Sequence, residues 1–122
     1  MVAMPRGQPL PMQIAGLEGT VLVKHAGAAV WEEVGPATLL CMGDTFQSSA
    51  KSGMTLSLAD GSRIVLSANS RLLLEHLDGG TRLRLDQGRM DLALNSPHPP
   101  FFVSTPNGRI EALGTEFTVA VE

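Results

Sequence analysis

The chain has 122 residues, a formal net charge of −3, an isoelectric point near 5.5, 43% hydrophobic residues and 17% charged residues. This length suits one domain with one hydrophobic core, and the balance of apolar and charged residues excludes disorder along most of the chain. The acidic balance provides no overall field that would attract phosphate, and without tyrosine there are few rings to stack on bases. Nucleic acid is therefore a poor candidate partner.

The first 12 residues contain three prolines and no apolar periodicity, so we predict a flexible tail or linker over residues 1–12 and a β domain over residues 13–122. From residue 13 onward, apolar and polar residues alternate, which is typical of strands with one buried face. In the first half of the domain we expect strands over residues 20–25, 29–34, 39–42 and 45–49. The alternation is clearest further on, at Met54, Leu56 and Leu58; Ile64 and Leu66; Leu72 and Leu74; Leu83 and Leu85; Met90, Leu92 and Leu94; and Phe117, Val119 and Val121.

Turn-forming residues separate these strands, at Asp60-Gly61, Asp78-Gly79-Gly80, Gln87-Gly88 and Asn107-Gly108. Tight turns join antiparallel neighbours, and the intervening segments are too short for the helical crossovers of a parallel sheet. The prediction is an all-β fold, an antiparallel β-sandwich or roll of about 10–12 short strands. A weak repeat between residues 56–66 and 72–85 leaves a β-solenoid-like stack as the alternative.

The single cysteine, Cys41, lies in the apolar run of residues 38–42, so no disulfide can form within the chain. No histidine or catalytic signature flanks it, and we expect a small buried side chain rather than a reactive thiol. No run reaches the roughly 18–20 apolar residues of a membrane-spanning helix, and no signal peptide is recognisable at the N-terminus. We expect either a soluble chain or a piece of a longer, anchored protein.

The histidines do not indicate a metal site. His25, His76 and His98 are far apart in the sequence, and none has the spacing to other ligands that a metal-binding strand pair would show. His76 follows Glu75 directly, but neighbouring residues of a strand point to opposite faces and cannot both bind one ion without a bulge. We predict no metal ion and no cofactor.

The acidic residues and serines do not indicate catalysis either. Asp44, Asp60 and Asp78 stand beside glycines, where turn residues bond to their own backbone, so we interpret them as solvated turns. Neither a nucleophile elbow nor a phosphate-binding glycine loop is present. We therefore predict that the chain is not an enzyme. Five serines are expected in polar turns or at outward positions, namely Ser48, Ser49, Ser62, Ser67 and Ser70.

Arginine is unevenly distributed along the chain. Five of the seven arginines lie between positions 63 and 89, namely Arg63, Arg71, Arg82, Arg84 and Arg89. The first four alternate with apolar core positions, which predicts an outward-facing, arginine-rich sheet face. Two interpretations stay open: a solvated face whose arginines pair with Glu75, Asp78 and Asp86, and a docking surface for an acidic protein. These five arginines are our candidate protein-binding residues.

Several short motifs occur in a characteristic order. They are Asp60-Gly61-Ser62, Asn69-Ser70, Gln87-Gly88, residues 100–106, and the sequence Gly114-Thr115-x-Phe117. Together with Gly43-Asp44 upstream, this order resembles the FecR family of bacterial cell-envelope signalling proteins, over roughly residues 16–122. The resemblance implies structural roles for Asp60, Gly61, Ser62, Gly88, Gly114, Thr115 and Phe117, with the glycines at turns where little side chain is tolerated.

The resemblance also implies a function. FecR-like proteins cross the inner membrane once and relay a signal from an outer-membrane receptor, as in iron-siderophore uptake, to a cytoplasmic sigma factor. This domain would then be periplasmic, not inserted in the membrane, and would bind the receptor's signalling domain or the remainder of the regulator. Family members often continue past the position of Glu122, which leaves either a truncation or an exposed edge there. The alternative function is a structural or glycan-associated envelope domain without a sigma factor.

Overall fold

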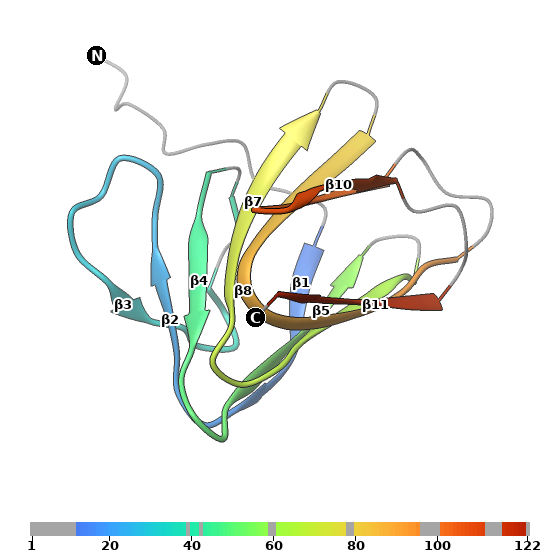
Figure 1. The fold of residues 1–122 in the computed structure, drawn as a ribbon. Coiled ribbons are helices and arrows are strands. Elements are labelled where there is room, and N and C mark those ends of the chain that lie inside the picture. The colour runs from blue at the N-terminus through green and yellow to red at the C-terminus, as the bar shows by residue number, and fades with distance from the viewer. Residues whose placement is uncertain are drawn as a thin grey trace, which may run out of the picture.

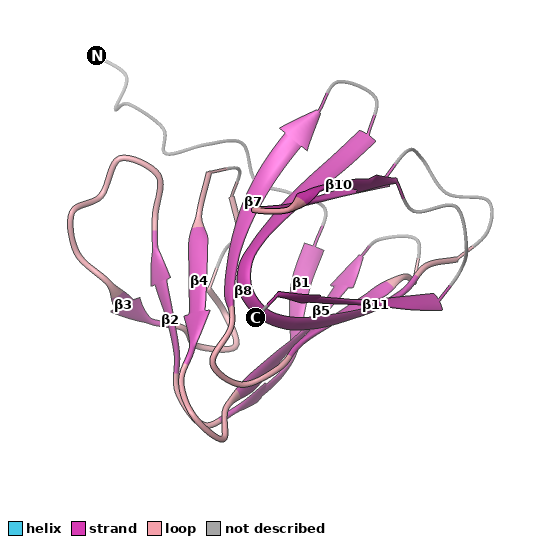
Figure 2. Ribbon diagram, in the orientation of Figure 1, coloured by secondary structure: helices cyan, strands magenta, loops and turns pink. Residues whose placement is uncertain are grey.

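The computed structural model describes residues 12–38, 40–41, 43–58, 61–77, 80–95, 101–111 and 116–121. Every regular element in this part of the chain is a β-strand, which confirms the predicted all-β fold (Figure 2). β1 begins at Met12, one residue before the expected start of the domain. The strands are β1 (Met12–Glu18), β2 (Val21–Lys24), β3 (Glu32–Glu33), β4 (Thr45–Ser48), β5 (Gly53–Leu58), β6 (Arg63–Leu66), β7 (Arg71–Leu77), β8 (Gly80–Ala93), β9 (Phe101–Thr105), β10 (Gly108–Glu111) and β11 (Glu116–Val121).

The strands form one curled sheet that folds over on itself (Figure 1). Half-sheet I contains β1, β5, β6, the second part of β8, and β11, in that order. Half-sheet II contains β3, β2, β4, β7, the first part of β8, β9 and β10. All pairs are antiparallel except β8 with β9, which are parallel. The predicted antiparallel roll is confirmed, and the solenoid-like stack is not observed.

The hydrophobic core lies between the two half-sheets, because the alternating apolar residues of both halves face inward. Leu72, Leu74, Leu83 and Leu85 of β7 and β8 are completely buried. Each fully buried side chain of this size stabilises the fold by about 1.5–3 kcal/mol. From the other half-sheet come Met54, Leu56, Ile64, Leu66, Met90 and Leu92. Cys41 is also buried, as expected.

The chain crosses between the half-sheets along one line, here called the crease, at residues 19–20, 49–52 and 67–70 and inside β8 at Gly88. Serine hydroxyls join adjacent crossings. Ser52 Oγ accepts a hydrogen bond from the Thr20 amide (2.9 Å), and Ser48 Oγ accepts one from the Ser70 amide (3.0 Å). Ser70 Oγ in turn accepts the Arg89 amide (3.0 Å). Ser48 and Ser70 are both buried, so an outward position was the wrong expectation for Ser48 in β4, whereas Ser70 lies in the connection between β6 and β7 but is not solvated.

Four local expectations also differ from the structure. Gln87-Gly88 was predicted as a turn between two strands, but it lies inside the continuous strand β8, which bends there. The two central residues of the β9–β10 hairpin are Pro106 and Asn107 rather than Asn107-Gly108, since Thr105 pairs with Gly108. The strand expected over residues 29–34 shortens to the two residues of β3, and residues 40–41 are not part of any of the eleven strands.

Candidate protein-interaction surface

The five candidate arginines do not share one face of the molecule. Arg71, Arg82 and Arg84 lie on the outer face of half-sheet II, where β7 and the first part of β8 pair. Arg63 and Arg89 lie on the outer face of half-sheet I, on β6 and the second part of β8. The division follows from the bend of β8 at the crease, because positions before and after Gly88 belong to different half-sheets. A single surface with all five arginines was the wrong expectation.

Neighbouring polar groups hold the three arginines of half-sheet II in place. Arg82 Nη2 lies 3.0 Å from Glu75 Oε2 on the adjacent strand, and both side chains are about one quarter exposed, at 28%. Arg71 donates a hydrogen bond to Gln47 (2.8 Å). Arg84 donates to Asp86 (2.7 Å), and that hydrogen bond, followed by the charge of Asp86, raises the pKa of Arg84. The pairing with Glu75 and Asp86 was anticipated from the sequence, whereas Asp78 lies outside the described residues.

An aromatic ring extends this surface. Phe102 of β9 is the register neighbour of Arg82, and the guanidinium of Arg109 on β10 lies 5.9 Å from the centroid of the Phe102 ring. We call Arg71, Arg82, Arg84, Arg109 and Phe102 the arginine face. Sequence reasoning missed Phe102 and Arg109, because only the parallel pairing of β9 with β8 brings them beside the other three arginines. Arginine and aromatic side chains are enriched at protein interfaces.

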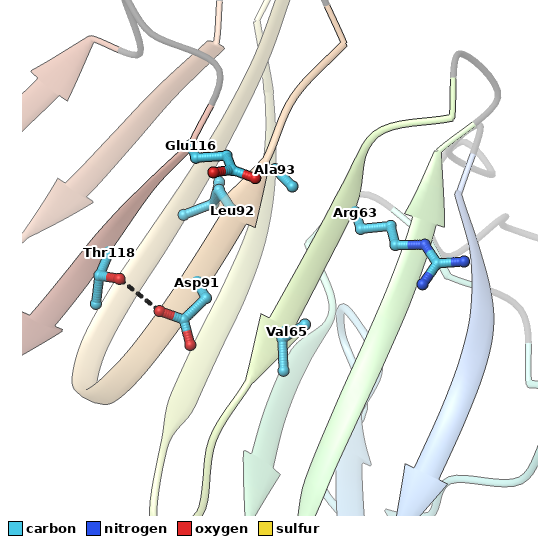
Figure 3. A pocket seen from close by; sticks show the side chains of 7 residues that line it. All are labelled: Arg63, Val65, Asp91, Leu92, Ala93, Glu116 and Thr118. Atoms are coloured by element: carbon cyan, nitrogen blue, oxygen red, sulfur yellow. Dashed lines mark hydrogen bonds between the residues drawn. The ribbon is translucent and has the colours of Figure 1, made fainter.

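The outer face of half-sheet I has a shallow groove instead, with a volume of about 460 Å³ (Figure 3). Its lining is Arg63, Val65, Asp91, Leu92, Ala93, Glu116 and Thr118. Asp91 accepts hydrogen bonds from Thr118 and, at 3.4 Å, from Arg89. In Figure 3 the Arg63 side chain points away from Asp91 and Glu116, so the opposite charges of the groove do not converge on one point.

The motif residues that the structure describes occupy tightly packed turns and bends. Gly61 has a φ of 89° in the β5–β6 hairpin. Ser62 beside it lies between the two strands, as a polar turn residue was expected to, but its side chain is buried. The Ser62 hydroxyl accepts a hydrogen bond from the Asn95 amide (2.9 Å). Gly88 has a φ of 96° and packs directly against Ser70. Phe117 is part of β11, and Asp60, Gly114 and Thr115 lie outside the described residues.

A buried polar cluster joins two loops whose contact was not predicted from the sequence. Asp44 is fully buried, so its interpretation as a solvated turn was wrong. Its carboxylate accepts hydrogen bonds from the amides of Ala26 and Cys41 (both 3.1 Å) and lies 3.0 Å from His25 Nδ1. His25 Nε2 is 3.7 Å from Glu32. The cluster fastens the loop after β2 to the loop before β4. Two of the partners of Asp44, His25 and Ala26, are 19 and 18 residues away in the sequence, and the third, Cys41, is on the same turn as Asp44.

Neither the cluster nor any other part of the described chain gathers three or more His, Cys, Asp or Glu side chains in a way that would hold a metal ion. His76 is part of β7, and His98 lies outside the described residues. In the same described part of the chain, no helix is long and apolar enough to cross a membrane.

A sequence model of a protein family, described as FecR protein, matches residues 44–122, which is well over half of the chain. The chain belongs to the FecR family. FecR is a regulatory family whose proteins are associated with the cell envelope. The matched region begins at the buried Asp44 and includes the crease residues Ser48, Ser70 and Gly88 as well as β11. Neither the characterised proteins nor the solved structures that were searched gave a match.

Proposed function

We propose that this FecR domain is the periplasmic signalling part of a sigma-factor regulator and that it binds another protein through the arginine face. The partner is the signalling domain of an outer-membrane receptor or the remainder of the regulator, and the signal is one received at the cell surface, such as iron-siderophore uptake. The domain catalyses no reaction in this scheme. Membership of a regulatory, envelope-associated family supports the proposal.

The observation that carries the proposal is the arrangement of the arginine face. Arg71, Arg82 and Arg84 are positioned by Gln47, Glu75 and Asp86 before any partner arrives. Side chains that are already ordered lose less conformational entropy on binding. Phe102 adds an apolar surface between Arg82 and Arg109. An acidic segment with one or two apolar residues is the partner chemistry that this surface complements.

A sigma-dependent promoter reporter in cells that carry the complete gene tests the proposal. Arg82→Gln with Arg84→Gln removes two charges from the arginine face, and Arg63→Gln with Arg89→Gln removes two charges from half-sheet I as a matched control. We expect the first pair to abolish the response of the reporter to the inducing signal and the second pair to preserve it. Equal responses from the two pairs would contradict the proposal. A reporter response that is unchanged when the domain is deleted would indicate the structural or glycan-associated role instead.

A further inference from the structure

The outer face of half-sheet II extends beyond the arginine face to β3, at the other end of the half-sheet (Figure 1). Register pairing places four residues in one row across this face: Glu33 pairs with Leu22, Leu22 with Gln47, and Gln47 with Arg71. Residues that pair across antiparallel strands lie on the same face of the sheet. The row therefore begins with an acidic side chain on β3 and ends with an arginine on β7.

The two ends of this row have no charged partner of their own. Glu33 is exposed, and Arg71 donates its hydrogen bond to the neutral Gln47. Among the residues that the structure describes, neither Glu33 nor Arg71 forms an ion pair. Three strand spacings, about 14 Å, separate them, so the two charges do not meet within one copy of the chain.

The next row, two residues further along the strands, is apolar at both ends. Trp31, the only tryptophan of the chain, directly precedes β3 and is 38% exposed. Leu73 of β7, which pairs with Thr45, is partly buried on the outer face. Strand alternation places Trp31 on the same side as Glu33, and Leu73 on the same side as Arg71. The acidic end thus carries an aromatic ring, and the arginine end carries an aliphatic side chain.

We propose that two copies of this chain pair through the outer faces of their half-sheets II. The two-fold axis lies between the two faces, parallel to the strands and midway between β2 and β4. It brings Glu33 of each copy to Arg71 of the other, and Trp31 to Leu73. Two-fold symmetry makes each of these contacts twice.

The distribution of charge on this face favours a second copy as the occupant. An acidic segment with an apolar residue complements the arginine face, and Glu32-Glu33 after Trp31 is the one place in the sequence where two acidic residues adjoin. Because the acidic and basic ends lie on the same face, a single axis satisfies both contacts and closes the dimer. Lys24 of β2 meets Thr45 of β4 across the axis, so no like charges face each other there.

The inference rests on the proposed function in one respect, that the partner and the second copy both use Arg71 and therefore exclude each other. The second copy occupies the arginine face while the partner is absent, and the partner displaces it on binding. The dimer is thus a way to regulate access to the arginine face.

A charge swap tests the pairing, measured by sedimentation equilibrium from about 10 µM to 1 mM. The unmodified chain should form a dimer, whereas Glu33→Arg and Arg71→Glu should each be monomeric, because like charges then face each other at both contacts. An equimolar mixture of the two variants should form a dimer again, since opposite charges meet at both contacts.

Glu116→Arg and Arg63→Glu on half-sheet I are the matched controls for the charge swap, and each should dimerise like the unmodified chain. An unmodified chain that stays monomeric over the whole range would overturn the proposal. So would two variants that keep the far-UV circular dichroism of the unmodified chain but stay monomeric when they are mixed.

Trp31→Ala provides a second measurement, which does not depend on the charges. It should weaken the dimer about tenfold or more, because Trp31 loses its contact with Leu73. The control is Val65→Ala on half-sheet I, where Val65 is 39% exposed, and it should leave the dimer within about twofold of the unmodified chain. Equal effects of the two substitutions would overturn the proposal.

The dimer and the proposed function fail separately in these experiments. Glu33→Arg retains every arginine of the arginine face, so it should bind the signalling domain of the receptor at least as tightly as the unmodified chain does. A monomeric chain that binds this domain would overturn the dimer alone. A dimer that does not bind this domain would contradict the proposed function alone.

Discussion

Among the glycines that the structure describes, Gly88 is the one at which an added methyl group should disturb the fold most. Its φ of 96° lies in the left-handed region, where an alanine costs about 1–2 kcal/mol. A Cβ at this position would also lie 2.5 Å from Ser70 Cα and overlap the Ser70 side chain. Because Ser70 is fully buried in the crease, the overlap cannot be relieved by a rotation into solvent, and overpacking of this kind costs about 1–3 kcal/mol more. Gly88→Ala should therefore lower the free energy of unfolding by about 2–5 kcal/mol.

Urea unfolding followed by far-UV circular dichroism measures this loss. Gly27→Ala is the matched control, since Gly27 also has a positive φ, 79°, but no atom lies within 4 Å of its added Cβ. The control should lose only the backbone contribution of about 1–2 kcal/mol. A Gly88→Ala variant as stable as Gly27→Ala would refute the close packing of Gly88 against Ser70 in the crease.

Other substitutions test the buried polar groups and the core by the same unfolding measurement. Asp44→Ala leaves the buried Cys41 amide and the partly buried Ala26 amide without an acceptor and should cost about 2–5 kcal/mol, whereas Asp91→Ala, on the surface, should cost less than about 1 kcal/mol. Ser62→Ala removes the acceptor of the Asn95 amide, for an expected loss of about 1–2 kcal/mol. Leu74→Ala should cost about 2–5 kcal/mol by opening a cavity, and a loss below that of Ser62→Ala would contradict the core assignment.

The strands and much of the core were predictable because they depend on local patterns. Alternation at Leu72 and Leu74, and at Leu83 and Leu85, is enough to identify the buried face of β7 and β8 from the amino-acid sequence alone. The hairpin at Gly61 was predictable for the same reason, since a glycine that tolerates positive φ between two alternating segments is a local signal. These features need no information about distant parts of the chain.

The remaining features depend on which distant segments meet. The pair Gln87-Gly88 is typical of a turn between two strands, but the positive φ of Gly88 bends the single strand β8 across the crease instead. This bend places Arg84 and Arg89 on different half-sheets. Asp44 is 19 residues from His25, so their contact follows from the pairing of β2 with β4. The arginine face was only partly predictable, since Arg109 reaches it through the parallel pairing of β9 with β8.

A direct binding titration tests the central claim, that the arginine face binds a protein partner. The purified chain is titrated with the periplasmic signalling domain of the outer-membrane receptor at low and high salt. We predict saturable binding whose affinity decreases as salt rises. The affinity should fall about tenfold or more in Arg82→Gln and stay within about twofold of that of the unmodified chain in Arg63→Gln. Binding that responds neither to salt nor to Arg82→Gln, or that responds equally to both substitutions, would contradict the claim.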